Sequence, residues 1–250
     1  MSEQEVLLRG RALSRRWGGL IAVNEVSLDL ARGEVHAVIG TNGAGKSTLI
    51  NLLSGEIAPS SGTVELLGRD ITAWSQPRRA QLGLGRSYQR NTIYPSFTVL
   101  ENCRLAAQAR TPRPWAVWEA AKRCERSLRA GREAAARTGL SDELDRPAGL
   151  LSHGQKRQLE IAMCLATAPQ VLLLDEPLAG MGAEETDRML GLLDELRAGH
   201  AILLVEHDMD AVFRVADRIT VMVNGAVIAT DTPEAVRLNP DVQAAYLGTH

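Results

Sequence analysis

A glycine-rich turn at positions 40–48 carries the residue types best suited to chemistry. It reads Gly-Thr-Asn-Gly-Ala-Gly-Lys-Ser-Thr, so that Gly40 is followed after four residues by Gly45, Lys46 and Ser47. This spacing is the P-loop pattern, in which glycines let successive backbone N–H groups face an anion. The residues before the turn predict a buried strand and those after it predict a helix. The turn therefore predicts binding of a nucleoside triphosphate.

The lysine and the serine of this turn have distinct expected roles. Lys46 supplies positive charge for the β- and γ-phosphates, and the Ser47 hydroxyl can ligate Mg²⁺. The following helix adds unpaired N–H groups and the positive end of its dipole. A glycine-rich turn without a ligand is the alternative, and the Lys-Ser pair argues against it. The expected phosphate-binding residues are Gly40, Asn42, Gly43, Ala44, Gly45, Lys46, Ser47 and Thr48.

Polar residues also stand at the ends of other predicted strands. An apolar run ends in Asp175, which would reach Mg²⁺, and in Glu176, which could polarise the attacking water. Gln89 closes a short strand and could contact Mg²⁺ or that water. His207 closes another and could hydrogen-bond the γ-phosphate. Because ligands bind at strand ends in open α/β sheets, these positions indicate a shared site rather than separate structural residues.

A second helix start has phosphate-binding character. Ser152 is a good N-cap, and Gly154, followed by Gln155, leaves the backbone open to an anion. Plain N-capping is the alternative on local grounds. The sequence thus offers two candidate phosphate-binding helix starts.

Composition limits the possible classes. The 250 residues are 45% hydrophobic and 4% aromatic, which predicts one large or two small α/β domains with an aliphatic core. A net charge of −2 argues against broad nucleic-acid binding. The sequence has no apolar run of transmembrane length, and its acidic start does not resemble a signal peptide. Cys103, Cys124 and Cys164 fit neither a disulfide framework nor a zinc site, and they fit reduced thiols in a cytoplasm.

Strand patterns dominate both ends of the sequence. Strands are expected at residues 6–8, 22–30, 34–39, 62–68, 171–174, 201–205, 218–223 and 226–230, and helices at 156–166 and 184–197. The helix at 184–197 lies between two buried strands, which predicts a βαβ unit. Asn224-Gly225 predicts a hairpin.

The middle of the sequence, residues 98–137, has helical character and is divided by Pro112 and Pro114. After the prolines, one helix face is apolar and the other basic. The apolar residues are Trp115, Trp118, Ala121, Cys124 and Leu128, and the basic ones are Lys122, Arg123, Arg126, Arg129 and Arg132. The basic face is interpreted as a solvated surface or, alternatively, as a contact with lipid or an acidic partner.

In order and spacing, five segments resemble the motifs of ABC ATPases. The turn at 40–48 resembles the P-loop, Gln89 the Q-loop, residues 151–155 the signature, residues 174–176 Walker B, and His207 the H-loop. The resemblance covers nearly the whole sequence. It implies an α/β fold that combines a P-loop NTPase core and mixed sheet with an N-terminal antiparallel β part and an inserted α-helical subdomain.

The resemblance also implies a division of the chain and a set of ligands. Residues 1–250 would form a single nucleotide-binding domain, with 1–91 and 165–250 as catalytic core and 92–164 as helical subdomain. ATP and Mg²⁺ would be its cofactors. Trp17 stands where the family places an aromatic ring that stacks on adenine, although a partly buried structural Trp is the alternative.

Each site residue acquires an expected role from this resemblance. Glu176 would be the general base, and His207 would position the γ-phosphate and the water. Ser47, Gln89 and Asp175 would serve Mg²⁺, with Gln89 also at the reaction centre. Two such chains would sandwich two ATP molecules. Each ATP would lie between one P-loop and the partner's signature residues, which correspond here to Ser152, Gly154 and Gln155.

Finer features resemble one subgroup, the ATPases of branched-chain (hydrophobic) amino acid importers. These features are residues 17–24, 98–102, 205–209 and 239–248. Urea and short-amide importers share them, and lipopolysaccharide-export ATPases are near relatives. Two positions depart from the common family pattern. His153 replaces a glycine of many signatures, and Gly182 replaces the commonest aspartate after Walker B, which bears on aspartate-mediated coupling between the two sites.

We therefore expect an ATP-hydrolysing transporter subunit for hydrophobic amino acids or similar small solutes. Its partners would be a second ATPase subunit, identical or paralogous, transmembrane permease subunits and, indirectly, a solute-binding protein, without nucleic acid. It would be a peripheral protein on the cytoplasmic face of the inner (plasma) membrane. Ile93, Tyr94 and Phe97 would dock the permease or, alternatively, anchor the helical insertion.

Three other functions compete with this expectation. The first is an exporter ATPase for lipid or lipopolysaccharide. The second is a soluble ABC ATPase that acts on nucleic acid or ribosomes; such proteins usually carry two cassettes or long coiled coils, and neither is evident here. The third is an unrelated P-loop kinase, against which the signature segment argues.

Overall fold

The computed structural model describes residues 5–87, 93–110 and 124–247. Its strands are β1 (Val6–Trp17), β2 (Leu20–Ala31), β3 (Val35–Gly40), β4 (Ser61–Leu66), β5 (Arg69–Asp70), β6 (Leu84–Arg86), β7 (Val171–Asp175), β8 (Ala201–Val205), β9 (Arg218–Val223) and β10 (Ala226–Asp231). Its helices are α1 (Lys46–Ser54), α2 (Gln76–Leu82), α3 (Val99–Arg110), α4 (Glu125–Arg137), α5 (His153–Ala166), α6 (Ala183–Arg197), α7 (Met209–Val215), α8 (Pro233–Leu238) and α9 (Pro240–Leu247).

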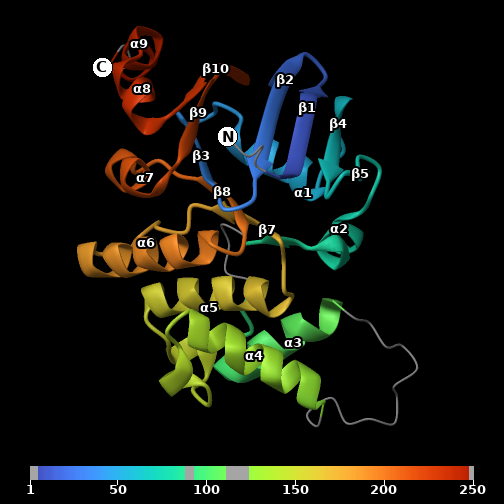
Figure 1. Ribbon diagram of the computed structural model, residues 1–250, viewed down its shortest axis with the longest axis vertical. Helices are drawn as coiled ribbons and strands as arrows, with labels where there is room; N and C mark the ends of the chain where they lie inside the picture. Colours follow the sequence, from blue (N-terminus) through green and yellow to red (C-terminus); the bar gives the residue numbers. More distant parts are fainter. Residues whose placement is uncertain (1–4, 88–92, 111–123, 248–250) are drawn as a thin grey trace.

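Within the described residues, the strands form two sheets (Figure 1). One is antiparallel in the order β2-β1-β4-β5, and the other has the order β10-β9-β3-β8-β7-β6. The second sheet is mixed, because β6, β7, β8, β3 and β9 run parallel while β10 pairs antiparallel with β9. Asn224 and Gly225 join β9 to β10 with positive φ angles of 48° and 82°, as the hairpin prediction requires. The predicted fold class is confirmed.

The mixed sheet is buried on both faces, which explains why its strands are apolar throughout. Along β7, Leu172 and Leu174 face one core, and Val171 and Leu173 face the other. The first core is completed by helices that include α5 and α6. The second is completed by α1 and the antiparallel sheet. Helix α1, which follows the glycine-rich turn, is therefore held between the two sheets.

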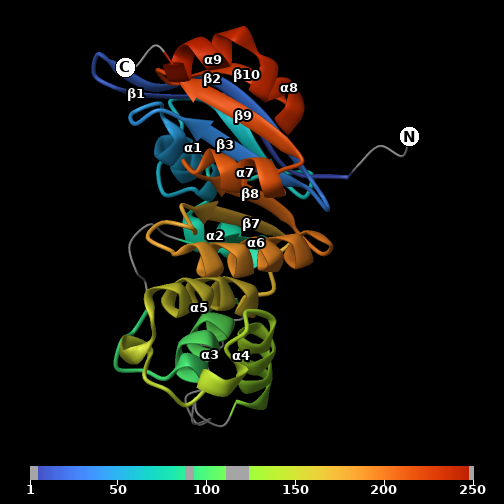
Figure 2. The same cartoon turned by 90° about the vertical axis from the view of Figure 1, so that its left-hand side faces the viewer.

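Helices α3, α4 and α5 pack on one another at the end of the molecule away from the antiparallel sheet (Figures 1 and 2). The predicted subdomain boundaries, 92 and 164, remain a prediction. Helix α5 extends two residues beyond the second boundary, to Ala166. Helix α4 exposes the predicted basic residues Arg126, Arg129 and Arg132. The predicted residues before Cys124, including Trp115, Trp118, Lys122 and Arg123, lie outside the described residues.

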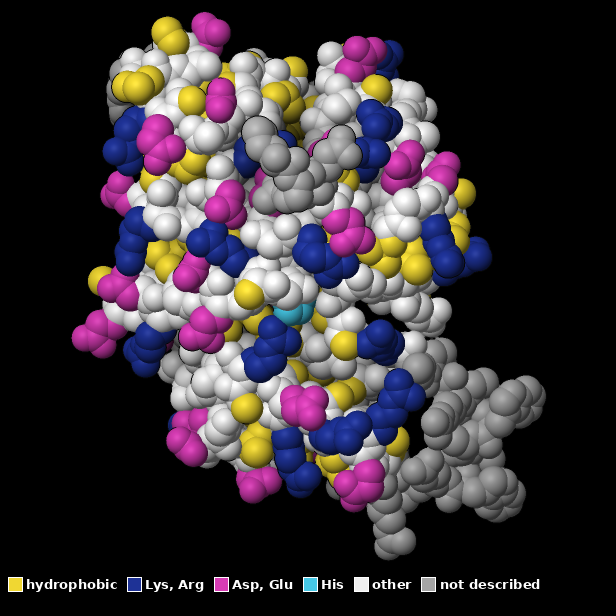
Figure 3. All heavy atoms as spheres, viewed as in Figure 1, with side chains coloured by type: hydrophobic (Ala, Val, Ile, Leu, Met, Phe, Trp, Pro, Cys, Tyr) yellow, Lys and Arg dark blue, Asp and Glu magenta, His cyan; other side chains and the backbone are white. Residues whose placement is uncertain are grey.

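The surface in Figure 3 carries acidic and basic side chains interspersed over both the sheets and the helical layer. This mixture agrees with the small net charge of −2. None of the helices in the described ranges is long and apolar enough to cross a membrane.

Several elements differ from the sequence prediction, among them β1, which was expected over residues 6–8 and extends from Val6 to Trp17. Helix α5 begins at His153, three residues before the predicted start, because Ser152 and Gln155 form a complete capping box. Helix α2 was not predicted. Its Arg79 is fully buried and donates hydrogen bonds to the carbonyl oxygens of Leu52 and Leu53 at the end of α1. Such a contact between distant segments leaves no local signal in the sequence.

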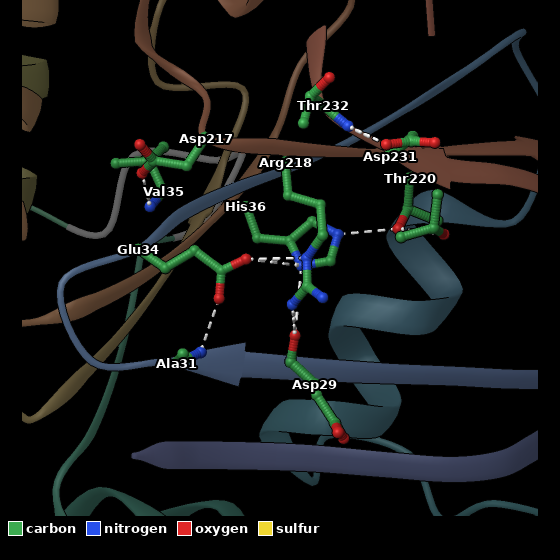
Figure 4. A network of polar contacts seen from close by, with 11 residues as sticks. Asp29, Ala31, Glu34, Val35, His36, Asp217, Arg218, Thr220, Asp231 and Thr232 are labelled. Atoms are coloured by element: carbon green, nitrogen blue, oxygen red, sulfur yellow. Dashed lines mark hydrogen bonds and ion pairs between the residues drawn. The ribbon is translucent and has the colours of Figure 1, made fainter. Parts of the chain in front are cut away.

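A buried polar network joins the two sheets near the start of β3 (Figure 4). His36 is only 1% exposed, and its Nε2 lies 2.7 Å from Thr220 Oγ1. Glu34 forms a 2.8 Å ion pair with Arg218, which also donates a hydrogen bond to the backbone oxygen of Asp29 in β2. Burial, followed by the charge of Arg218, lowers the pKa of His36 to about 3. The imidazole is therefore neutral in the folded protein at every pH near neutrality.

This network predicts that acid destabilises the fold through His36. Unfolded histidine has a pKa near 6.5, so the unfolded chain binds more protons than the folded chain between pH 6.5 and about 3. Stability should therefore fall as the pH drops through this window, by about 2–3 kcal/mol between pH 7 and 4.5. His36→Gln keeps a polar side chain that can hydrogen-bond the Thr220 hydroxyl and does not titrate, so its stability should fall less.

Urea unfolding of both proteins at pH 7 and pH 4.5 measures the difference. The two proteins are compared because Glu34 contributes to both. Burial raises the pKa of Glu34, so this residue stabilises the fold as the pH falls and partly offsets the destabilisation by His36. Equal losses of unfolding free energy in the two proteins would contradict the prediction.

Candidate functional site

Two glycines of the 40–48 turn are required by close backbone packing. Gly40 has φ 156°, and a Cβ atom there would overlap the carbonyl oxygen of Met222 in β9. Gly45 has φ 101°, and a Cβ atom there would overlap the carbonyl oxygen of Ala22 in β2. The turn thus passes between strands of both sheets, and only glycine fits at these two points.

The turn ends at a helix start that has no side-chain cap. Gly45 is the N-cap of α1, and the first turn of α1 contains no acidic residue. Its first N–H groups therefore remain available to an anion, while Asn42, Gly43 and Ser47 are exposed beside them. The helix predicted after the turn begins within it, at Lys46.

The lysine of the turn is held close to the backbone. Lys46 Nζ donates hydrogen bonds of 2.6 Å to Gly40 O and 3.2 Å to Thr41 O. Burial lowers the pKa of Lys46, and the charges of Glu176 and Asp175 oppose that shift. The two predicted carboxylates therefore lie near enough to this amine to act on it electrostatically.

Asp175 has the properties of a cation ligand. It is buried at the end of β7, and its Oδ1 atom has no hydrogen-bond partner. Burial raises its pKa, and the charge of Arg86 at the end of β6 is the largest opposing influence. A buried carboxylate oxygen without a partner is costly unless a cation or donor arrives. The residue therefore fits a Mg²⁺ ion, which uses one or two carboxylates together with substrate phosphates.

No group of three or more His, Cys, Asp or Glu residues that could hold a metal occurs among the described residues. A complete protein cage is thus not found there, whereas Asp175 and the exposed hydroxyl of Ser47 suit an ion that is shared with a nucleotide.

Glu176 has a constrained backbone next to this site. Its φ is 49°, in the left-handed region, where a residue with a side chain is uncommon. Its N–H donates to Val205 O at 2.9 Å, and its carbonyl oxygen accepts a 3.2 Å hydrogen bond from Ala179. Its Oε1 atom lies 4.0 Å from Nδ1 of His207, whose side chain is exposed. The two residues predicted to act on the water and the γ-phosphate therefore lie together.

A buried carboxylate that the sequence prediction missed supports both of them. Glu206 is 0% exposed. Its Oε1 accepts the N–H of Leu178 at 2.8 Å, and its Oε2 accepts the N–H of His207 at 3.1 Å and lies 3.7 Å from His207 Nδ1. Burial raises its pKa, and the backbone hydrogen bonds oppose that shift. The available signal was an acidic residue at a buried strand end, directly before His207.

The predicted stacking residue lies at the exposed end of the β1–β2 hairpin. Trp17 is 44% exposed, and Arg15 lies over its ring at 4.9 Å. The same hairpin brings Ala22 against Gly45 of the turn. An exposed ring near the phosphate-binding turn suits a nucleotide base and fits poorly with a purely structural tryptophan.

The second predicted helix start lies elsewhere. Ser152 Oγ accepts the N–H of Gln155 at 3.2 Å, and Gln155 Oε1 accepts the N–H of Ser152 at 3.0 Å. The open side of Gly154 is filled by Glu185 of α6, so a Cβ atom there would overlap that carboxylate. The N-capping interpretation is thus confirmed, and phosphate binding at this helix start remains a prediction.

One chain unites only part of the predicted site. Lys46, Asp175, Glu176 and His207 gather at the ends of β3, β7 and β8. Figures 1 and 2 place α1 among the sheets and α5, whose N-cap is Ser152, in the helical group. Gln89 lies outside the described residues.

Comparison with known proteins gives consistent matches. Residues 23–179 match the ABC transporter family, and residues 226–250 match the branched-chain amino acid ATP-binding cassette transporter family. The high-affinity branched-chain amino acid transport ATP-binding protein LivG of Salmonella typhimurium is 39% identical over 251 residues, covering 97% of this chain and 98% of LivG. BraF of Pseudomonas aeruginosa, which bears the same description, is 39% identical over 249 residues with the same coverage.

Solved structures agree with the sequence relatives. A nucleotide-free ATP-binding cassette from an ABC transporter matches with a TM-score of 0.87 at 30% identity, covering 96% of this chain and 98% of that one. The ADP conformation of an ATP-binding cassette matches with a TM-score of 0.85 at 31% identity, covering 97% and 99%.

The position of Glu206 predicts a kinetic defect when its charge is removed. In Glu206→Gln, an amide N–H₂ would face one of the two backbone N–H donors, so the Glu176 loop or His207 would shift. A displacement of about 1 Å near reacting groups can cost roughly a hundredfold in rate. We expect kcat for ATP hydrolysis to fall about tenfold to a hundredfold, with ATP affinity little changed.

The same substitution in a His207→Ala background is the control. If Glu206 acts partly through His207, the second change should cost less there than in the native chain. Circular dichroism and urea unfolding check that the variants fold. A native kcat in a folded Glu206→Gln protein would contradict the role.

Proposed function

Because this chain belongs to the ABC transporter ATPase family, we propose that it powers uptake of branched-chain amino acids or closely related small solutes. The family assignment makes the protein an ATP-binding and ATP-hydrolysing transporter subunit. The proposal for the solute rests on similarity along 97% of the chain to LivG and BraF. The separate match of residues 226–250 to a branched-chain amino acid transporter segment supports it. These matches favour an importer over the exporter or soluble alternatives.

The proposed chemistry rests on one observation: Lys46, which follows β3, lies near enough to Asp175 and Glu176 at the end of β7 for their charges to act on its amine. Residues 40–48 would bind the phosphates, with Lys46 leaving its backbone acceptors to meet their charge. Ser47, Asp175 and Gln89 would hold Mg²⁺, which supplies charge neutralisation at the phosphates. The unpartnered Asp175 Oδ1 supports this assignment.

The proposed reaction is in-line attack of water on the γ-phosphorus. A bond from the water oxygen forms as the bond to the bridging oxygen breaks, and Glu176 receives a water proton. His207 would orient the γ-phosphate and the water. Trp17 would stack on adenine.

The proposed active form contains two chains. Within one chain, the helix start at Ser152 lies in the helical group and the P-loop lies among the sheets. In a dimer, Ser152, Gly154 and Gln155 would complete the ATP site of the partner. The exposed position of Ser152 supports this arrangement. The partner chain would be a second copy or a paralogue.

The permease would dock beside α3, and the subunit would then lie at the cytoplasmic face of the membrane. Tyr94 and Phe97 are 50% and 37% exposed, with their rings stacked at 5.3 Å. The backbone beneath them is fixed, because buried Asn102 accepts the N–H of Tyr94 at 2.8 Å and donates to its carbonyl oxygen at 3.1 Å. A rigid loop that exposes two aromatic rings suits a protein contact.

The function predicts separate effects of Glu176→Gln on binding and turnover. Loss of the general base should reduce ATP hydrolysis by about 10²–10⁴-fold while ATP binding persists. In cells that lack the native chain, this variant should fail to restore uptake of labelled leucine. Glu133→Gln changes an exposed carboxylate on α4 and is the matched control. Hydrolysis near the native rate in Glu176→Gln would refute the catalytic assignment. If the native chain, returned to these cells, restored uptake of urea and not of leucine, the proposed solute would be refuted.

The docking surface predicts selective loss of the permease. Tyr94→Asp should release the subunit from its membrane partner during purification in detergent, because a charge would be buried in an apolar contact. The isolated variant should keep its ATPase activity, since Asn102 holds the backbone. Leu238→Asp is the control, as Leu238 is an exposed apolar residue on α8, distant from α3. Retention of Tyr94→Asp in the complex with native transport would exclude this surface.

A further inference from the structure

The start of α5 is tied to the loop that follows Glu176 by a side chain the proposed function does not use. His153 Nε2 lies 3.0 Å from the backbone carbonyl oxygen of Ala179. A carbonyl oxygen can only accept a hydrogen bond, so Nε2 carries the proton and donates. His153 stands between Ser152 and Gly154, where many signatures have glycine, and glycine could not make this bond.

A second hydrogen bond connects Ala179 to the backbone of Glu176, the proposed general base. The N–H of Ala179 donates to the carbonyl oxygen of Glu176 at 3.2 Å. A short series therefore runs from the His153 ring through one residue, Ala179, to the backbone of Glu176. That backbone has φ 49° and is fixed on its other side by Val205 O. Displacement of the imidazole would therefore change the hydrogen bonding of Ala179 and, through it, the backbone position of Glu176.

The loop is shaped to receive the imidazole. Gly180 has φ 75°, and a Cβ atom there would lie 3.0 Å from His153 Nε2. Neighbouring contacts hold the same two segments together, because Glu185 of α6 fills the open side of Gly154 and accepts the N–H of Gly182 at 3.4 Å. The start of α5 and the loop after Glu176 are thus packed against each other. His153 contributes a direct side-chain hydrogen bond from α5 to this loop.

We propose that His153 is a positioning residue that couples the two ATP sites of the active dimer. The inference rests on the two-chain arrangement proposed above, in which Ser152 contacts the partner's ATP while Glu176 acts on the ATP of its own chain. Binding of ATP against the α5 start then moves or restrains His153, and the hydrogen bonds through Ala179 pass this to Glu176. Gly182, which replaces the common aspartate in the loop after Glu176, has no side chain that could couple the two sites. In this proposal, the imidazole of His153 at the start of α5 provides that coupling.

Two substitutions separate the hydrogen bond from the shape of the ring. His153→Gln keeps an N–H donor of similar reach, and His153→Phe keeps a planar ring without a donor. Each is placed in the full-length Glu176→Gln chain, which should bind ATP without consuming it. Equilibrium dialysis gives the ATP binding curve and its Hill coefficient, light scattering gives the dimer fraction with ATP, and thermal unfolding without ATP reports stability.

The coupling predicts a Hill coefficient above 1 for the chain with His153 and for His153→Gln. For His153→Phe we expect a coefficient of 1 and a weakening of the second binding step by about fivefold or more, the lower end of typical couplings. Rescue by glutamine is the diagnostic result, because a purely structural role would change the unfolding temperature and leave the Hill coefficient unaltered.

Two results would overturn the inference in distinguishable ways. If ATP produces dimers and His153→Phe binds ATP with the same Hill coefficient as the chain with His153, whatever that coefficient is, the inference fails and the proposed function stands. If saturating ATP produces no dimer of the chain with His153, the two-chain arrangement fails and the inference fails with it.

Discussion

The close passage of the 40–48 turn between two strands is the constraint on which the site depends. Gly40 lies against Met222 O and Gly45 against Ala22 O, so the turn is held by the mixed sheet on one side and the antiparallel sheet on the other. The N–H of Gly225 also donates to Ala44 O at 3.0 Å. Because α1 starts at this point and fills the core between the sheets, phosphate binding and the packing of the two sheets use the same backbone.

Charge balance is the second organising feature. Asp175, Glu176 and Glu206 bring three carboxylates to neighbouring strand ends, and the charges of Arg86 and Lys46 act on Asp175. Glu206 is satisfied by backbone N–H groups, whereas Asp175 retains a buried oxygen without a partner. The two carboxylates therefore differ in what they can do: Glu206 holds the loop at Leu178 and the backbone of His207, whereas Asp175 has an oxygen that suits a cation.

Local sequence patterns predicted those parts of the fold that depend on local physics. Glycines before Lys46, apolar runs in β7 and β8, and Asn224-Gly225 each restrict the backbone by themselves, so the turn at 40–48, these strands and the hairpin were predicted correctly. Glu206 and the Arg79 contact beneath α2 depend on partners far away in the sequence, as does the filling of the Gly154 space by Glu185. A single sequence carries no signal for such pairs, and His153 could be recognised only as a departure from a pattern.

The separation of the two helix starts then acquires a physical meaning. A P-loop alone leaves one side of a bound triphosphate open to water, and the chain cannot close that side with its own α5, which lies in the helical group. We propose that a second chain supplies this closure, and the hydrogen bond between His153 and Ala179 joins the proposed closing surface to the loop that follows Glu176. In the proposed dimer, the start of α5 would contact one nucleotide, while the hydrogen bond from His153 to Ala179 links it to the loop of Glu176, which would act on the other nucleotide.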